Sequence, residues 1–283
     1  MRAQGPRVAV VGHVEWVRFA CVPSVPQAGE IVHAHGPFEE PAGGGAVAAV
    51  QLARLAGEAT LFTALGEDEH GRRAVERLGE LGVDVCAARR PEPTRTAVTL
   101  VDDAGERTIT TFGPRLAPAG EDAALPWAAL AEMDAVYFTA GDAAALRAAR
   151  AARVVVASPR AGEALTATDG TPLDALVLSE RDELEREVLA RVSERARLIV
   201  LTDGARGGSY REPRSGASGT WPAAAPPAAP VDSYGCGDSF AAGLTFGLAA
   251  GLATPDALAL AARCGAACLT GRGPYEAQLR EAA

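Results

Sequence analysis

The residues best suited to carry chemistry lie in one short segment near the C-terminus, residues 231–243 (VDSYGCGDSFAAG). Gly235 and Gly237 precede Asp238 at the start of a predicted helix. Glycine allows the backbone to turn tightly and approach a ligand closely, and the free amides and dipole of a helix N-terminus form an anion site. A carboxylate in that first turn can accept a proton from a hydroxyl whose oxygen attacks phosphorus. The segment therefore predicts phosphoryl-group chemistry with Asp238 as the base.

The same segment has two other interpretations. Asp238 could be an ordinary first-turn residue favoured by the helix dipole, with the glycines only shaping a turn. A dinucleotide-binding fingerprint fails, because the Gly-x-Gly follows a loop rather than a strand and Phe240 stands where the third glycine belongs.

Lysine is absent from the whole chain, and all 27 basic residues are arginine. A P-loop lysine, a Schiff-base lysine and the strand lysine of protein kinases are therefore excluded. Any phosphate chemistry must rely on backbone amides, arginine and a metal ion.

Composition and charge restrict the class of protein. At 283 residues with 48% hydrophobic content, the chain can build one sizeable core. The net charge of −9 argues against a nucleic-acid or anionic-membrane partner. No apolar run reaches the roughly 18 residues that span a bilayer, and the N-terminal 16 residues show no signal-peptide cleavage site. The expected compartment is the cytoplasm.

The five cysteines fit reduced thiols better than a disulfide framework, because their number is odd and no CxxC spacing occurs. Cys264 and Cys268 lie four residues apart on an apolar helix without a nearby histidine. Buried small residues are a better interpretation of this pair than a metal site.

The elements that must position Asp238 alternate between strand and helix along the chain. Short apolar runs predict buried strands at 7–12, 60–66, 83–88, 135–141, 154–158, 173–179 and 198–204. Helical periodicity predicts helices over 46–56, 72–81, 142–152, 180–195, 238–250 and 255–270. Such alternation is typical of an α/β fold with a mostly parallel sheet.

Two segments depart from this alternation. Residues 96–112 contain two alternating β runs around the turn sequence Asp102–Gly105, which predicts a hairpin. Residues 207–212 and 218–223 predict a second hairpin, followed by a stiff Pro-Ala loop at 222–230.

Four motifs together resemble the ribokinase-like (PfkB-type) carbohydrate kinases. The stretch 232–243 resembles the C-terminal signature of that family, and residues 42–49 (AGGGAVAA) echo its N-terminal signature. Residues 65–71 (LGEDEHG) resemble its G-x-D-x-x-G segment, and 204–207 (GARG) its G-x-x-G. The order and spacing of these matches follow the family across essentially the whole chain.

The resemblance implies a three-layer α/β sandwich with a small β lid, formed as one domain over residues 1–283 with lid segments near 14–40 and 92–113. It implies ATP and Mg²⁺, a small-molecule acceptor bound between domain and lid, and leaves a monovalent cation open. Relatives often pair through their lids, so a homodimer is an expectation.

The resemblance also assigns residues. Asp238 matches the catalytic base, and the backbone of Gly235, Cys236 and Gly237 matches the anion hole. Gly43 and Gly44 fall in the sugar-binding turn, although they could simply cap the helix at 46–56. The remaining matched positions are those expected to face the nucleotide or its metal: Ser179, Thr202, Gly204, Gly207 and, for Mg²⁺, Asp182 with Glu183.

Several of these positions depart from the family pattern. Ser179 replaces the Asn and Asp182 the Glu of the family's N-x-x-E motif. Glu15 and Val17 stand where ribokinases have Asn and Asp, while Val47 replaces a signature Asn and Gly44 a signature Lys. A site built to bind the hydroxyls of one substrate strongly rejects substrates that do not match it. Because the residues at these positions differ from those of ribokinases, ribose itself is not the expected acceptor.

Other side chains near the predicted lid have open roles. We hypothesise that Glu15 accepts acceptor hydroxyls and that Trp16 supplies a stacking face; the alternative is that both lie in the lid hinge. Arg95 and Arg107 flank the hairpin, where they could meet an anionic acceptor or ATP phosphates, or be solvated. His33 and His35 alternate on a predicted strand, and the run Glu180–Glu187 is expected on the exposed face of a helix.

The sequence thus favours an ATP-dependent kinase for a hydroxyl of a sugar or sugar-like molecule. Two alternatives remain open: a nucleoside kinase, and a non-catalytic ligand-binding protein that retained the fold. The Gly235–Asp238 motif favours catalysis, because pure binding does not need a base.

Overall fold

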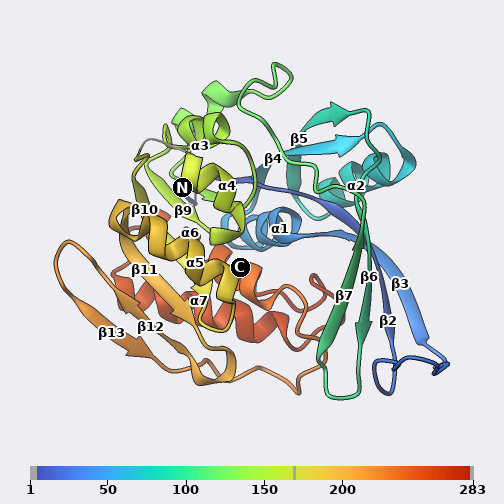
Figure 1. Cartoon of the computed structure of the whole chain (residues 1–283). Helices are drawn as coiled ribbons and strands as arrows, with labels where there is room; N and C mark the ends of the chain where they lie inside the picture. The colour runs from blue at the N-terminus through green and yellow to red at the C-terminus, as the bar shows by residue number, and fades with distance from the viewer. Residues whose placement is uncertain (1–4, 168–169, 281–283) are drawn as a thin grey trace.

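The computed structural model describes residues 5–167 and 170–280, and within them a large sheet has nine strands (Figure 1). Seven of these strands pair in parallel, and two more add an antiparallel hairpin at one edge. In spatial order the strands are β13 (Ser218–Trp221), β12 (Gly208–Arg211), β11 (Ala196–Thr202), β10 (Leu173–Ser179), β9 (Val154–Ala157), β8 (Ala135–Phe138), β1 (Val8–Val11), β4 (Ala59–Gly66) and β5 (Val83–Arg90).

Strand β1 shows why the sequence signals buried strands as continuous apolar runs. Val8 and Val10 pack into the core on one face of the sheet, and Ala9 and Val11 into the core on the other. All four side chains are at most 3% exposed. Both faces of a parallel strand are covered, so alternation with polar residues disappears.

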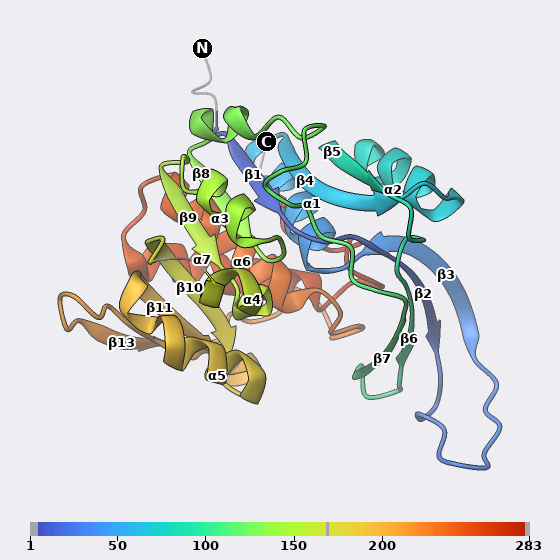
Figure 2. The ribbon, with the colours of Figure 1, turned by 45° about the horizontal axis from the view of Figure 1, so that its top comes forward.

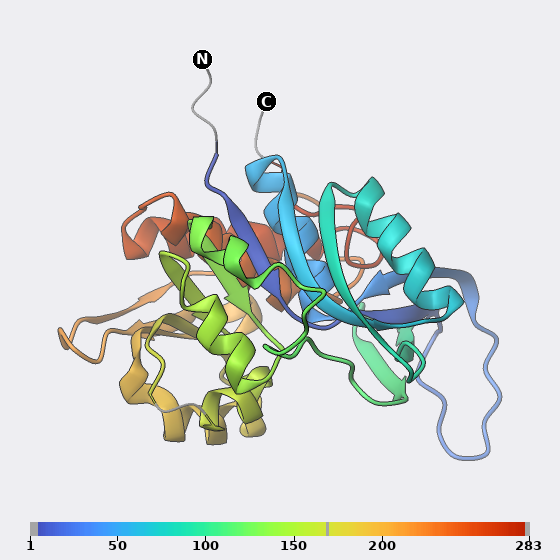
Figure 3. The same cartoon turned by 90° about the horizontal axis from the view of Figure 1, so that it is seen from above.

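Helices cover both faces of the large sheet, as Figures 2 and 3 show from two further directions. One face carries α1 (Gly44–Ala56), α6 (Cys236–Ala249) and α7 (Thr254–Cys268), and α2 (Glu69–Glu80) packs beside β5 and the small sheet. The other face carries α3 (Ala143–Ala149), α4 (Gly162–Ala167) and α5 (Glu183–Val192). Single 3-10 turns are η1 (Trp127–Glu132), η2 (Pro159–Ala161), η3 (Ser193–Arg195) and η4 (Gly204–Arg206).

A small sheet projects from the domain and forms the predicted lid (Figures 1 and 2). Its spatial order is β3 (His35–Ala42), β2 (Glu15–Cys21), β6 (Thr96–Val101) and β7 (Arg107–Phe112). The central strand β2 is largely buried, whereas every residue of the edge strand β7 is exposed. The α/β class with a mostly parallel sheet and a small β lid is thereby confirmed, while a homodimer through the lid stays a prediction.

Several sequence predictions were wrong in detail. Helix α4 and the turn η1 were missed, because each is too short to show periodicity. His33 lies in the loop before β3 and not on a strand with His35, so the two side chains do not share a strand face. The helix expected over 180–195 begins only at Glu183, after its N-cap Asp182.

Within the two described ranges, no helix is both long enough and apolar enough to cross a bilayer. The compartment of the protein stays a prediction.

Candidate active site

Predicted site residues and others that the sequence did not mark meet at the edge where the central parallel strands end. β1 runs into His13, β8 into Thr139, β9 into the turn that carries Arg160, and β10 ends at Ser179. The carboxyl ends of parallel strands lie on one edge of a sheet, and this edge is where α/β proteins bind ligands. The N-terminus of α6 arrives at the same place, because α6 packs against β8 and β9.

Asp238 occupies the first turn of α6, as predicted. The helix is capped by Gly235 with φ of 81°, a left-handed conformation that favours glycine. A Cβ placed on Gly44, at the start of α1, would lie only 3.0 Å from Asp238 Oδ1. The structure thus brings together the two glycine-rich segments, 190 residues apart in sequence, and leaves the carboxylate beside the bare backbone of Gly44.

The charge of Asp238 is set by burial and by two cations. Burial raises the pKa of the carboxyl above its usual range, and the guanidinium groups of Arg160 and Arg107 oppose that rise. The side chain is intermediate in exposure, so it can reach a ligand. We call Gly235–Asp238 with Arg107 and Arg160 the Asp238 cluster.

Arg160 joins the Asp238 cluster to the start of α5. Its Nε lies 2.9 Å from Glu185 Oε1, and its Nη2 lies 3.6 Å from Asp182 Oδ2. Glu185 is 5% exposed and its Oε2 accepts a 2.8 Å hydrogen bond from the amide of Ser179. The prediction that the run 180–187 is an exposed helix face was therefore wrong at Glu185, which anchors Arg160 and the end of β10.

Arg107 connects the lid to the loop before α6. From β7 its Nη1 donates a 3.1 Å hydrogen bond to Ser233 Oγ, and the amide of Ser233 donates to the carbonyl of Gly105. Asp232, which is 3% exposed, accepts from the amides of Tyr234 and Gly273 and so holds the loop from the other side. The lid hairpin therefore contacts the segment that presents Asp238.

A second group of side chains, which we call the Glu15 cluster, consists of His13, Glu15, Gly43, Arg95 and Arg115. Glu15 is 7% exposed and its Oε2 lies 3.4 Å from Arg95 Nε. Burial raises the pKa of Glu15, Arg95 opposes the rise, and Asp238 adds to it. Asp238 is thus close enough to Glu15 for the two carboxylates to repel each other.

His13 packs against the glycine turn. A Cβ on Gly43 would lie 3.0 Å from His13 Nε2 and 3.3 Å from Glu15 Cγ. Burial, with Arg115 and Arg95, lowers the pKa of His13 to about 3, so the imidazole is neutral at physiological pH. Among the residues that the structure describes, His13 Nδ1 and Glu15 Oε2 have no hydrogen-bond partner. Buried polar atoms are normally satisfied, so these two fit contacts to a ligand.

Trp16 and Val47 lie near the site but are packed. Trp16 is 5% exposed; its ring stacks on His70 at 5.7 Å, and the Arg73 guanidinium lies 4.3 Å from the ring centroid. This environment corresponds to the alternative in which Trp16 belongs to the lid hinge. Val47 is fully buried, and its Cγ1 lies 2.9 Å from where a Cβ on Gly235 would be, so it supports the cap of α6.

The residues expected to face a nucleotide gather at the ends of β10 and β11. Ser179 and Thr202 pair across these strands, and Thr202 Oγ1 donates to the carbonyl of Leu178. Gly204 and Gly207 lie at the two ends of the turn η4 between β11 and β12. Asp182 caps α5 by accepting a hydrogen bond from the Glu185 amide.

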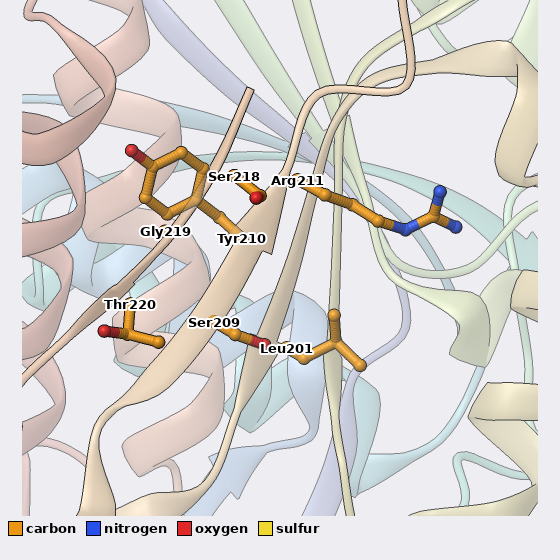
Figure 4. Close-up of a pocket in the computed structure, with 7 residues that line it drawn as sticks. All are labelled: Leu201, Ser209, Tyr210, Arg211, Ser218, Gly219 and Thr220. Atoms are coloured by element: carbon orange, nitrogen blue, oxygen red, sulfur yellow. The ribbon is translucent and has the colours of Figure 1, made fainter. Parts of the chain in front are cut away.

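Two hollows of similar size lie beside this region. One, of about 380 Å³, lies on the β12–β13 hairpin, and none of the predicted site residues lines it. Figure 4 labels the residues that do: Leu201, Ser209, Tyr210, Arg211, Ser218, Gly219 and Thr220. The other, about 390 Å³, lies between Trp221–Ala224 and α7 and is mostly apolar. Trp221 in its wall stacks on Phe240 of α6, two residues beyond Asp238.

Sequence reasoning missed four residues of the site: His13, Arg115, Thr139 and Arg160. His13 directly follows a predicted strand, Arg160 lies two residues beyond another, and Thr139 is among the last three residues of a third. These positions were a usable signal at the carboxyl edge of a parallel sheet. Arg115 lies in an irregular segment after β7, and no local pattern marks it.

A large parallel sheet, a four-stranded lid, and a helix N-terminus that carries a carboxylate at the sheet edge together define the ribokinase-like fold class. Solved structures agree with this class. A microbiome-derived acarbose kinase superposes with a TM-score of 0.79 at 22% identity, covering 97% of this chain and 96% of that one. Ribokinase from Arabidopsis thaliana, complexed with ribose and ATP, superposes with a TM-score of 0.74 at 20% identity, covering 97% and 96%.

Sequence comparison gives the family. The model of the pfkB family carbohydrate kinases matches residues 6–281, and the chain therefore belongs to that family. A curated relative, the acarbose 7(IV)-phosphotransferase of an Actinoplanes species, is 40% identical over 98 residues. That match spans 35% of this chain and about a third (32%) of the relative.

Proposed function

We propose that this protein transfers the terminal phosphoryl group of ATP to a hydroxyl of a sugar or sugar-like small molecule. The observation that carries the proposal is the position of Asp238, in the first turn of α6, beside the bare backbone of Gly44 and under the influence of Arg160 and Arg107. Its geometry suits a base that takes the hydroxyl proton as the oxygen attacks phosphorus. Family membership supports the same reaction class.

The backbone of the Asp238 cluster supplies the anion site. The first amides of a helix have no partner within the helix, so those of Gly235, Cys236 and Gly237 are available to phosphoryl oxygens. Preorganised donors of this kind stabilise charge that develops in the transition state. Arg160 is held by Glu185 and Arg107 by Ser233, so both cations are positioned before a ligand arrives.

The apolar hollow between Trp221–Ala224 and α7 suits an adenine base, because its walls are largely aliphatic and aromatic. Its wall reaches α6 through the Trp221–Phe240 stack. Thr202, Gly204 and Gly207, in the adjoining β11–β12 connection, would then lie along the nucleotide. The Arabidopsis ribokinase complexed with ribose and ATP supports a nucleotide of this type.

Magnesium would be held mainly by the nucleotide phosphates. In the described residues there is no group of three or more His, Cys, Asp or Glu side chains that could bind a metal ion. Mg²⁺ usually keeps several waters and takes one or two carboxylates plus substrate phosphates. Asp182 fits such a role through water, because its Oδ2 has only the 3.6 Å contact with Arg160. When bound, the ion would neutralise phosphate charge.

The test is ADP release from MgATP over a panel of sugars, sugar acids, polyols and nucleosides, with Asp238→Asn as the variant. We expect acceptor-dependent turnover whose kcat falls roughly 10²- to 10⁴-fold in Asp238→Asn. Asp256→Asn is the matched control, because Asp256 is an exposed aspartate in the first turn of α7. Undiminished kcat in Asp238→Asn would disprove the mechanism. ATP binding without turnover on any acceptor would indicate a non-catalytic member of the family.

A further inference from the structure

The Glu15 cluster contains more positive charge than its single carboxylate can balance. Its titratable members are His13, Glu15, Arg95 and Arg115. His13 contributes no charge, since its pKa is lowered to about 3. Two guanidinium groups of the cluster therefore face its one carboxylate, and outside the cluster the exposed Glu163 also acts on Arg115. Charges that are partly removed from water, like that of Arg95, are normally paired.

Arg95 is held in place by the lid, but not all of its hydrogen-bond donors are satisfied. Its side chain is 21% exposed, and its Nη2 donates a 2.6 Å hydrogen bond to Thr111 Oγ1 of the neighbouring lid strand. Its Nε faces Glu15 Oε2 at 3.4 Å, yet in the described part of the chain neither atom makes a hydrogen bond. The pair is thus oriented by the lid, with one donor and one acceptor left open.

Arg115 has no carboxylate within 4 Å anywhere in residues 5–167 and 170–280. Its Nη2 donates to the carbonyl of Arg160, which fixes the guanidinium without neutralising it. Burial, together with Arg95 and Arg160, lowers the pKa of Arg115. Arg115 is an exposed residue, so a ligand can reach its side chain.

We infer that the acceptor carries an anionic group, a carboxylate or a phosphate, which Arg95 and Arg115 bind. Glu15 then accepts a hydrogen bond from a hydroxyl of the same acceptor molecule. This inference rests on the proposed function, because it names the class of acceptor for that site. Guanidinium groups bind carboxylate and phosphate oxygens through paired, charge-assisted hydrogen bonds. The expected acceptors are therefore sugar acids or sugar phosphates.

The phosphates of ATP are the competing occupant for these arginines. Two other cations, Arg160 and Arg107, are the ones that act on Asp238, whose carboxylate marks the point of phosphoryl transfer. Arg95 and Arg115 act on both Glu15 and His13, and Arg160 adds the smallest of the three effects on His13. Arg95 lies 3.4 Å from Glu15, whereas Arg160 is paired with Glu185 and Arg107 is bonded to Ser233 in the loop before α6. This arrangement favours separate sites for the transferring phosphoryl group and for the acceptor anion.

The experiment compares matched acceptors that differ in charge. D-gluconate is paired with D-glucitol, and D-glucose 6-phosphate with D-glucose, which separates carboxylate from phosphate; acarbose, which carries no anionic group, is a further arm. Turnover is measured by ADP release, and binding by calorimetry without ATP. We expect at least one anionic acceptor to exceed its neutral parent roughly tenfold or more in kcat/KM and in affinity.

Substitution of Arg115 tests whether this residue binds the anionic group of the acceptor. In Arg115→Gln the ratio of kcat/KM for the anionic over the neutral acceptor should fall roughly 10- to 100-fold, and Arg115→Lys should restore part of it. Arg147→Gln, an exposed arginine on α3, is the control and should leave the ratio unchanged. A rise in the KM for ATP with equal loss on every acceptor would place Arg115 on the nucleotide and overturn the inference.

The outcomes separate this inference from the proposed function. Turnover of neutral sugars or acarbose without any preference for anionic acceptors overturns the inference and leaves the kinase assignment standing. Binding of anionic acceptors without phosphoryl transfer to any acceptor overturns the kinase assignment and leaves the anion site standing. A panel in which no anionic member binds or reacts overturns the inference.

Discussion

The Asp238 cluster and the Glu15 cluster lie side by side but are constructed differently. The anion site of the first comes from the backbone of one continuous segment, Gly235–Asp238, at a helix N-terminus. The second consists of side chains from separate segments: His13 and Glu15 around the start of β2, Arg95 before β6, and Arg115 after β7. The anion site of the first cluster thus depends on local backbone geometry, whereas the second cluster depends on how the lid and the sheet come together.

This difference has a functional consequence. A backbone anion site serves any phosphoryl transfer, whatever the acceptor, and tolerates changes elsewhere in the chain. Side chains supplied by separate segments can be replaced one at a time, as the departure from the family pattern at Glu15 illustrates. We therefore expect substitutions in the Asp238 cluster to reduce turnover of every acceptor, and substitutions in the Glu15 cluster to change which acceptor is used.

Among the substitutions that test this difference between the clusters, Gly235→Ala should have the largest effect on kcat and stability. Gly235 has φ of 81°, and an added Cβ would lie 2.9 Å from Val47 Cγ1. The left-handed conformation alone costs about 1–2 kcal/mol for a residue with a Cβ, and displacement of the loop by about 1 Å can cost roughly 10² in rate. We expect lower Tm and about 100-fold lower kcat on all acceptors, measured by calorimetry and ADP release.

Gly237→Ala is the matched control for that prediction. A Cβ on Gly237 meets no atom within 4 Å, and its φ is not positive. Replacing a helical glycine by alanine should raise stability by about 0.5–1 kcal/mol. Equal losses of stability in the two variants would contradict the assignment of Gly235 as the conformational requirement of the Asp238 cluster.

A smaller effect, confined to the Glu15 cluster, is expected from Glu15→Gln. The pKa of Glu15 is raised in the folded protein, so folding favours the protonated form. The stability from this group is fully present below the unfolded pKa and is lost as pH rises through the folded pKa. The neutral variant should therefore have a higher Tm than the wild type near pH 7, with the difference vanishing in acid.

The same variant tests the role of Glu15 in binding. Loss of a charged acceptor for a hydroxyl should raise the acceptor KM by roughly tenfold or more, with kcat less affected. If Glu15→Gln retained the wild-type acceptor KM, hydroxyl binding by Glu15 would be contradicted. A wild-type Tm that does not decline relative to the variant between acid and neutral pH would contradict its burial as a charged group.

The sequence predicts local features of the site well and contacts between distant segments poorly. Asp238 and Gly235 were found because glycine, carboxylate and helix start stand next to one another, and the apolar strands were found because both faces of the sheet are covered. Arg115 and the burial of Glu185 were not found, since each depends on contacts with residues far along the chain or on the orientation of one helix. Local patterns do not contain that information.

The smallest effect is expected at the hinge of the lid. Trp16 there could either pack the hinge or offer a stacking face to the acceptor. Arg73→Ala removes the cation 4.3 Å from the Trp16 ring centroid and a 3.6 Å ion pair with Glu39. A cation–π contact at an exposed arginine contributes about 0.5–1 kcal/mol, which corresponds to a fall in Tm of roughly 1–4 °C. If Trp16 is a packing residue of the hinge, the acceptor KM should stay within twofold of wild type.

Arg72→Ala provides the comparison, because Arg72 lies on the same turn of α2 but forms ion pairs with Glu69 and Glu76 on the surface. Its Tm should fall less than that of Arg73→Ala. A tenfold rise in acceptor KM in Arg73→Ala, with Tm no lower than in Arg72→Ala, would mean that the Trp16 ring serves the acceptor rather than the hinge. Trp16 would then join the Glu15 cluster, and the lid would contribute an aromatic face as well as Arg95 to acceptor recognition.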